Sequence, residues 1–263
     1  PTRRSSIWPF WGGTYFPKPA FLQVISAITD VWVNRRSDLE QNAAALVTAI
    51  GKSASTEPKS EVPGVDVVNT ALARIAGAFD SEWGGFGSAP KFPSTFHIEL
   101  VLRAFMTNGG VDARRVAVTS LDAMASGGMY DHIGGGFARY STDREWLVPH
   151  FEKMLYDQAL LVRVYRQAHS VTALPQYRQV VEETIAYVLR DLRHPDGGFY
   201  SAEDADSPDD DGHGHEGLFH TWTPTEVRAA LGGWPDTQVA EVLDWFGITE
   251  AGNFVEDGVS RSI

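Results

Sequence analysis

The segment from Pro149 to Asp157 contains the side chains that proton transfer uses. Proline suits the first position of a helix, so we expect a helix that begins at Pro149 and holds His150 in its first turn. On that helix His150, Lys153 and Asp157 share one face, because residues three, four and seven apart are neighbours. A histidine, a carboxylate and a lysine that meet in a cleft can act as general acids and bases. The residues predicted to be catalytic are His150, Glu152 and Asp157, and those predicted to bind substrate are Lys153 and Tyr156.

A structural role is the alternative for these residues. His150 and Glu152 would then satisfy free amides at the helix end, and Lys153 would pair with Asp157.

The loop before this segment alternates arginines with aspartates between Asp131 and Arg144. This spacing favours salt links that brace a long loop, and contact with a ligand is the alternative. If the loop does contact a ligand, His132 is a second candidate for the catalytic base. The residues predicted to bind substrate in this loop are Asp131, Arg139, Tyr140 and Trp146.

A third candidate is the acidic run from Glu203 to Asp206. Glycoside hydrolysis uses two carboxylates, one as acid and one as base or nucleophile, so Glu203 and Asp204 are predicted to be catalytic. Adjacent acids also cap backbone amides, which is the alternative. The stretch 209–216 lacks the regular ligand spacing of a calcium loop, so we expect a solvated turn there and no metal site.

Helical periodicity must position these residues, and it continues through most of the chain after residue 64. The predicted helices span 65–79, 95–107, 112–126, 149–169, 175–192, 224–231 and 236–245. Their connections alternate between short ones and long ones that are rich in glycine and aromatic residues. The short ones lie near 108–111 and 170–174, and the long ones at 80–94, 127–148 and 193–223.

Each long connection carries a related signature, which is a weak internal repeat. The three copies are Trp83-Gly84-Gly85-Phe86, Gly134-Gly135-Gly136-Phe137 and Gly197-Gly198-Phe199-Tyr200. In antiparallel helices every second connection emerges at the same end, so we expect the long loops to form the mouth of one pocket. Aromatic rings there would suit the apolar faces of a sugar, and Tyr200 is predicted to bind substrate.

The first 64 residues have a different pattern. Apolar residues recur at helical spacing from Phe21 to Trp32, and Ser37 with Glu40 forms a capping box that opens a second helix ending near Ile50. Residues 51–64 have the composition of a linker. We therefore expect a domain boundary within 51–64.

Composition limits the classes of function. The 263 residues carry a formal net charge of −12, which argues against nucleic acid as a partner because its phosphates are bound by clustered lysine and arginine. No apolar run is long enough to span a membrane. The sequence contains no cysteine, which excludes disulfides and thiolate chemistry within it. We expect a cytoplasmic location by default.

Two long segments carry a resemblance to a known family. Residues 127–137, Gly-Gly-Met-Tyr-Asp-His-Ile-Gly-Gly-Gly-Phe, and residues 148–158, Val-Pro-His-Phe-Glu-Lys-Met-Leu-Tyr-Asp-Gln, closely resemble the spermatogenesis-associated, thioredoxin-domain protein family. Shorter stretches at 12–17, 87–93 and 201–207 match the same family in the same order.

The resemblance implies a thioredoxin-like domain followed by an (α/α) toroid similar to six-hairpin glycosidases and N-acylglucosamine 2-epimerases. The expected fold is mainly α: residues 1–50 are the C-terminal part of the thioredoxin-like α/β domain, 51–64 a linker, and 65–263 the first half of the toroid. The family's cysteine-bearing segment would precede residue 1, and the helices predicted after residue 64 are fewer than a closed ring needs. We therefore expect an incomplete chain.

The resemblance and the candidate residues together predict a carbohydrate-active toroid, either epimerase-like or glycosidase-like, that binds a small-molecule sugar and needs no cofactor. The alternative is a redox-linked or protein-binding module in which the toroid recognises an unknown protein partner. The sequence names neither substrate nor partner.

Overall fold

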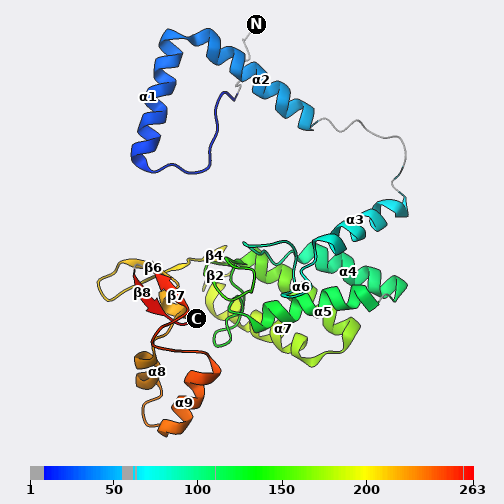
Figure 1. The fold of residues 1–263 in the computed structure, drawn as a ribbon, viewed down its shortest axis with the longest axis vertical. Coiled ribbons are helices and arrows are strands. Elements are labelled where there is room, and N and C mark those ends of the chain that lie inside the picture. Colours follow the sequence, from blue (N-terminus) through cyan, green and yellow to red (C-terminus); the bar gives the residue numbers. More distant parts are fainter. Residues whose placement is uncertain (1–8, 55–61, 63, 110, 257) are drawn as a thin grey trace. The chain divides into compact units, whose positions relative to one another are not determined.

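The structure, a computed structural model, describes residues 9–54, 62, 64–109, 111–256 and 258–263. The chain divides into two compact units, residues 1–63 and residues 64–263 (Figure 1). No described helix is both long enough and apolar enough to cross a membrane.

The N-terminal unit, as far as it is described, consists of the two helices α1 (Lys18–Asn34) and α2 (Arg36–Ala54), which contact one another. Helix α2 continues past Ile50, so part of the predicted linker is helical. Residues 9–54 contain no strand, and their assignment to a thioredoxin-like domain stays a prediction.

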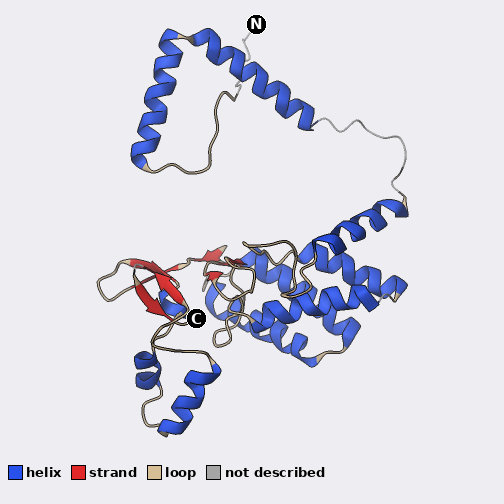
Figure 2. Cartoon of the chain, viewed as in Figure 1, coloured by secondary structure: helices blue, strands red, loops and turns tan. Residues whose placement is uncertain are grey.

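The C-terminal unit is mainly helical, as predicted, with short paired strands (Figure 2). Its helices are α3 (Val65–Ala78), α4 (Thr95–Asn108), α5 (Val111–Ser126), α6 (Leu155–Thr172), α7 (Pro175–Tyr187), α8 (Pro224–Ala230) and α9 (Asp236–Trp245), and α7 continues as a π-helical turn, η1 (Val188–Leu192). The antiparallel strand pairs are β1 (Tyr140–Ser141) with β2 (Pro149–His150), β3 (Lys153–Met154) with β4 (Ala202–Glu203), β5 (Asp206–Pro208) with β6 (Gly214–Glu216), and β7 (Phe254–Glu256) with β8 (Val259–Arg261).

The main core lies among α4, α5, α6 and α7. Helices α4 and α5 form one hairpin, α6 and α7 form a second, and α4 contacts α6. Ile98, Leu121 and Leu161 are fully buried between them, and the buried Tyr165 donates its hydroxyl hydrogen to the carbonyl of Leu121 at 2.7 Å. Helical hairpins that pack side by side in this way are the building unit of an (α/α) array.

The long connections meet at one end of these hairpins, as predicted. Lys91 of the first loop pairs through its backbone with Ser141 of the second, and the indole nitrogen of Trp146 donates to the carbonyl of Trp83 at 2.9 Å. The strand pair β3–β4 joins Lys153 to Glu203 of the third loop. The three long loops therefore lie together, as the alternation of short and long connections predicted.

One predicted element begins at the wrong residue. The helix expected over 149–169 begins at Leu155, and residues 149–154 are extended. The backbone of Pro149 and His150 pairs with β1, and that of Lys153 and Met154 pairs with β4, so long-range pairing replaces the expected first helical turns. In an extended segment alternate side chains point to opposite faces, so His150 does not share a face with Lys153.

Candidate functional site

Two glycine turns brace the mouth, each around an aspartate that is paired with a buried lysine. In the first turn, Nζ of Lys91 donates to Oδ2 of Asp80 at 2.7 Å and to the carbonyl of Gly84 at 2.8 Å. Arg144 also donates to Asp80, at 2.6 Å. Burial by itself would raise the pKa of Asp80, but the hydrogen bonds from Arg144 and Lys91 outweigh it and hold the pKa far below its usual range.

The second turn repeats this arrangement. Nζ of Lys153 donates to Oδ2 of Asp131 at 2.8 Å and to the carbonyl of Gly135 at 3.1 Å. The amide of Gly134 also donates to Asp131, at 2.7 Å. Burial opposes ionisation of Asp131, and the charge of Lys153 lowers its pKa in spite of that. These contacts show that Asp131 and Lys153 brace the loop.

The repeat in the sequence is thus a repeat in structure, and it contains a residue pair that sequence reasoning missed. Asp80 and Lys91 were not singled out, although Asp80 stands four residues before Gly84 as Asp131 stands four before Gly135. That spacing is the signal from which the pair could have been found.

A group of polar side chains lies beside these turns, and we call Arg139, His150, Glu152, Asp157 and Glu216 the His150 cluster. Nδ1 of His150 lies 2.7 Å from Oε1 of Glu216, and its Nε2 lies 3.7 Å from Oε2 of Glu152. Arg139 donates to the same Glu152 oxygen at 2.7 Å. An imidazole is therefore held between two carboxylates, and Glu216 is a cluster member that the sequence did not indicate.

Asp157 completes the cluster from the first turn of α6. Burial raises the pKa of Asp157 to about 6, with the charge of Glu152 adding to the rise and that of Arg139 opposing it. Its Oδ2 is buried and has no hydrogen-bond partner among the described residues. An unpaired buried polar atom is costly, so this oxygen is a ready partner for a bound ligand.

Aromatic rings extend the cluster towards solvent. The ring of Tyr140 stacks on His150 with centroids 5.1 Å apart, and the ring of Phe92 lies 4.8 Å from that of Tyr140. Phe92 and Tyr156 are exposed. These faces can take the apolar side of a ring-shaped ligand.

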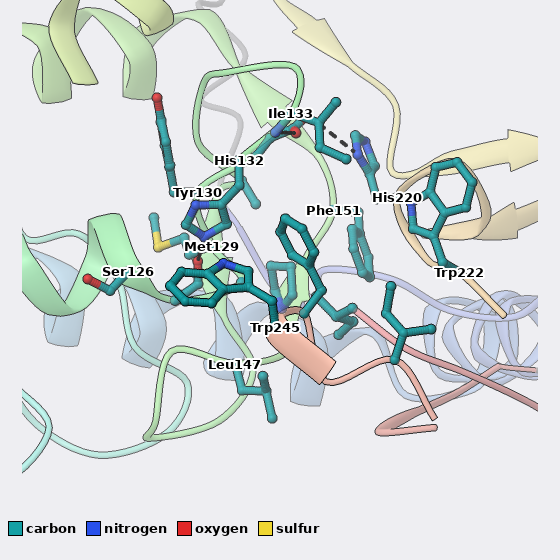
Figure 3. Close-up of a pocket in the computed structure, with 18 of the residues that line it drawn as sticks. Ser126, Met129, Tyr130, His132, Ile133, Leu147, Phe151, His220, Trp222 and Trp245 are labelled. Atoms are coloured by element: carbon teal, nitrogen blue, oxygen red, sulfur yellow. Dashed lines mark hydrogen bonds and ion pairs between the residues drawn. The ribbon is translucent and has the colours of Figure 1, made fainter. Parts of the chain in front are cut away.

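A separate apolar pocket of about 670 Å³ lies on the opposite face of the extended segment 149–154 (Figure 3). Phe151 and Lys153 line it, together with His132 of the second loop, Trp222 of the third loop and residues of α8 and α9. Figure 3 shows His132, Phe151 and Trp245 around the cavity. His150, Glu152, Asp157, Glu203 and Asp204 are not among its lining residues, so this pocket does not unite all the predicted site residues.

The remaining predicted residues have mainly structural contacts. Glu203 accepts a hydrogen bond from the hydroxyl of Tyr187 at 2.6 Å, and the exposed Asp204 caps the amide of Asp206 at 3.1 Å. Trp146 was predicted to bind substrate, but it is fully buried and packs the first two loops together. Tyr200 is exposed beside the third glycine turn.

The acidic stretch after β5 forms an exposed turn. Oδ1 of Asp209 accepts from the amides of Asp211 and His213, at 3.0 and 2.8 Å. These three side chains could bring ligand atoms within 4.8 Å of one another. Hydrogen bonds from the backbone amides of His213 and Asp211 lower the pKa of Asp209, and the bond from His213 has the largest effect. These bonds account for the arrangement.

No family model matches the chain, but individual proteins do. Human spermatogenesis-associated protein 20 is 39% identical over 268 residues, covering 94% of this chain and 34% of that protein. An uncharacterised protein of Caenorhabditis elegans is 31% identical over 94% of the chain. The chain therefore spans about one third of the length of these relatives.

Solved structures that resemble the chain include two cellobiose 2-epimerases. The one from Bacillus thermoamylovorans is 14% identical and covers 69% of this chain and 55% of its own, with a TM-score of 0.47. The one from Spirochaeta thermophila is 17% identical and covers 71% and 54%, also with a TM-score of 0.47. Scores of this size do not establish a common fold. The sequence identity does not depend on these scores, and it shows that the chain belongs to the family of spermatogenesis-associated protein 20.

Proposed function

We propose that residues 64–263 are part of a carbohydrate-active enzyme that works by proton transfer in the His150 cluster, in the manner of a sugar epimerase. The observation that carries the proposal is a half-buried imidazole held between Glu216 and Glu152, next to a carboxyl group whose pKa is raised to about 6. An imidazole and a neighbouring carboxyl group whose pKa is raised by burial are the kinds of group that general acid–base catalysis requires.

His150 is the base in this proposal. A carboxylate only accepts hydrogen bonds, so Glu216 favours the tautomer in which Nδ1 of His150 carries the hydrogen. The lone pair on Nε2 is then free on the side of Glu152. An epimerase base removes the proton from the carbon next to a sugar carbonyl, and Nε2 would accept that proton.

Asp157 is the acid. Its protonated form would donate to the carbonyl oxygen as the proton leaves the neighbouring carbon, which gives a neutral enediol. The hydroxyl proton of the enediol would then return to Asp157. Rotation of the enediol about its C2–C3 bond would turn the opposite face of C2 towards protonated His150, and return of the proton from Nε2 to that face would complete the epimerisation. Arg139 orients Glu152 through a hydrogen bond of 2.7 Å, so Glu152 is placed to bind sugar hydroxyls or to stabilise the protonated imidazole.

The sugar assignment rests on the rings beside the cluster and on the family resemblance. Tyr140 and Phe92 present aromatic faces next to His150, and Tyr156 is exposed nearby in sequence on α6. Hydrolysis by Glu203 and Asp204 has less support, because Glu203 is bonded to Tyr187 and Asp204 to a backbone amide. An epimerase is therefore favoured over a hydrolase.

The test uses the full-length protein in D₂O with a panel of reducing monosaccharides and disaccharides. Exchange of the hydrogen at C2 for deuterium, followed by proton NMR, is the expected result. The variant His150→Gln should lose about 10²-fold or more of this exchange. His213→Gln, at an exposed histidine of the 209–213 turn, is the matched control and should retain it. Cleavage of a disaccharide without exchange at C2, or no exchange with any sugar, would contradict the proposal.

A further inference from the structure

The third glycine turn has the same backbone pattern as the first two. In each turn a bridge closes the loop: Phe79 with Phe86, Tyr130 with Phe137, and Arg193 with Phe199. The amide that follows the closing phenylalanine donates back across the turn in all three, from Gly87 to Ala78, from Ala138 to Met129 and from Tyr200 to Leu192, at 2.8, 2.9 and 2.8 Å. The third turn is one residue shorter than the first two between its bridged residues, and it is closed by the same bridge and the same returning hydrogen bond.

The first two turns each rest against a helix. A Cβ atom on Gly84 would lie 2.7 Å from the carbonyl oxygen of Thr119 in α5, and one on Gly135 would lie 2.7 Å from that of Glu183 in α7. The turn that follows α3 thus packs on α5, and the turn that follows α5 packs on α7. The rule predicts that the turn after α7 and η1 packs on a helix further along the chain.

No described atom fills that position. A Cβ atom on Gly197 or Gly198 would have nothing within 4 Å. The closing phenylalanines differ accordingly: Phe86 and Phe137 are 8% and 0% exposed, whereas Phe199 is 48% exposed. Ile185 and Leu189 before the turn are also exposed. The positive φ angles explain why glycine occurs here, but they do not explain an exposed apolar surface.

We infer that Gly197–Tyr200, with Ile185 and Leu189, is a docking surface for an α-helix of the same polypeptide that follows residue 263. The two packed turns define the occupant as a helix that presents a backbone carbonyl to the first glycine. Helices α8 and α9 do not occupy the site, because they pack in a core of their own and leave both glycines open. The relatives are about three times as long as this chain, so polypeptide for such a helix exists in them.

A second copy of the chain is a poorer occupant. The two helices shown to fit such a turn, α5 and α7, are already covered by the turns at Gly84 and Gly135. A second copy would have to uncover one of them before its helix could dock. An intramolecular helix meets no such competition.

Hydrogen exchange in the full-length protein tests this without any substitution. The amides of Ala138 and Tyr200 make equivalent hydrogen bonds, at 2.9 and 2.8 Å, but only the turn of Ala138 is covered in the structure. If a helix covers the third turn, the Tyr200 amide will exchange as slowly as that of Ala138. Exchange as fast as at Gly212, in an exposed turn, would overturn the inference.

A photo-reactive phenylalanine analogue at position 199 of the full-length protein identifies the occupant. We expect a cross-link within one polypeptide to a segment after residue 263, and no such link from the same analogue at the exposed Phe219. A cross-link to a second copy, a cross-link only within residues 1–263, or none at all would overturn the inference.

Discussion

Glu152 and Asp157 show how the surroundings of two carboxyl groups divide roles between residues of similar chemistry. Arg139 pairs with Glu152 at 2.7 Å, whereas burial favours the neutral form of Asp157. Two carboxyl groups a few residues apart in the sequence thus lie in different surroundings, one in an ion pair with an arginine and the other with a buried oxygen that has no hydrogen-bond partner among the described residues. Different surroundings for neighbouring titratable groups are the usual basis for assigning them different roles in catalysis.

The hydrogen bond from His150 to Glu216 predicts a specific defect. In Glu216→Gln the new amide can donate to Nδ1, which favours the tautomer with hydrogen on Nε2 and removes the lone pair that the proposed base needs. We expect proton-transfer activity to fall by about 10²-fold. Nitrogen NMR of the imidazole should show the change of tautomer even where activity is not measured.

Glu241→Gln, at an exposed position on α9, is the matched control and should change neither the activity nor the imidazole spectrum. An unchanged tautomer in Glu216→Gln would show that Glu216 does not orient His150.

The raised pKa of Asp157 predicts a pH dependence of stability. The folded protein binds this proton up to about pH 6, whereas the ordinary value is 3.8, so between these values the folded state binds more protons than the unfolded state. This group's contribution to the free energy of unfolding is most favourable below pH 3.8 and is lost as the pH rises through 6. In Asp157→Asn that dependence should disappear.

Urea unfolding at pH 4 and pH 7 measures the difference. Relative to the wild type, Asp157→Asn should gain stability between pH 4 and pH 7, and Asp112→Asn, at a 94% exposed side chain, should not. Parallel pH profiles for wild type and Asp157→Asn would contradict the raised pKa.

At the scale of elements, short pieces of extended chain decide which side chains meet. The segment 149–154 sends His150 and Glu152 to one face and Phe151 and Lys153 to the other, where they line the apolar pocket. The glycine turns then fix the loops around it through the Asp80–Lys91 and Asp131–Lys153 pairs. Positioning of the candidate site thus depends more on loop bracing than on helix faces.

The buried pair in the first turn predicts a large loss of stability when it is broken. Lys91 is fully buried, and Lys91→Met would leave Asp80 without one of its two cationic partners. We expect the free energy of unfolding to fall by about 3–5 kcal/mol, as for other buried pairs. Arg178→Met, which breaks an exposed pair with Glu182, should cost less than about 1 kcal/mol in the same urea titration.

The close approach of the second turn to α7 gives another prediction. Gly135→Ala would strain a positive φ of 78° and also press a methyl group on the carbonyl of Glu183. Gly212→Ala strains a similar φ of 82° in open space. The difference in stability between the two variants should be about 1–3 kcal/mol, the usual cost of overpacking. Equal losses would mean that the turn does not pack closely on the helix.

At the scale of the whole molecule, the division into two units follows the change in composition along the chain. Along the sequence, the boundary between the units falls between residues 63 and 64, inside the segment predicted as a linker. We expect limited trypsin digestion to cut after Lys59, in this proline- and serine-rich stretch, before it cuts within α4–α7. Lys59→Ala should delay release of the C-terminal fragment, and early cutting within α4–α7 would contradict the expectation.

The helices of the C-terminal unit could be predicted from the sequence alone, because each buries an apolar stripe whose period is visible locally. The residue ranges agree closely for α3, α4, α5 and α9, and a capping box of Thr223 and Glu226 opens α8. The gathering of the long loops at one end also followed, since it depends only on antiparallel packing and on loop length.

Only the tertiary structure decided which polar residues meet. The start of α6 moved from Pro149 to Leu155 because backbone pairing with β1 and β4, which are distant in sequence, outweighed a local helix signal. The same long-range contacts bring Glu216 to His150 across 66 residues and bury Trp146 instead of exposing it to a substrate. Periodicity reports how one element meets the core, whereas partners between loops depend on where the folded helices place the loop ends.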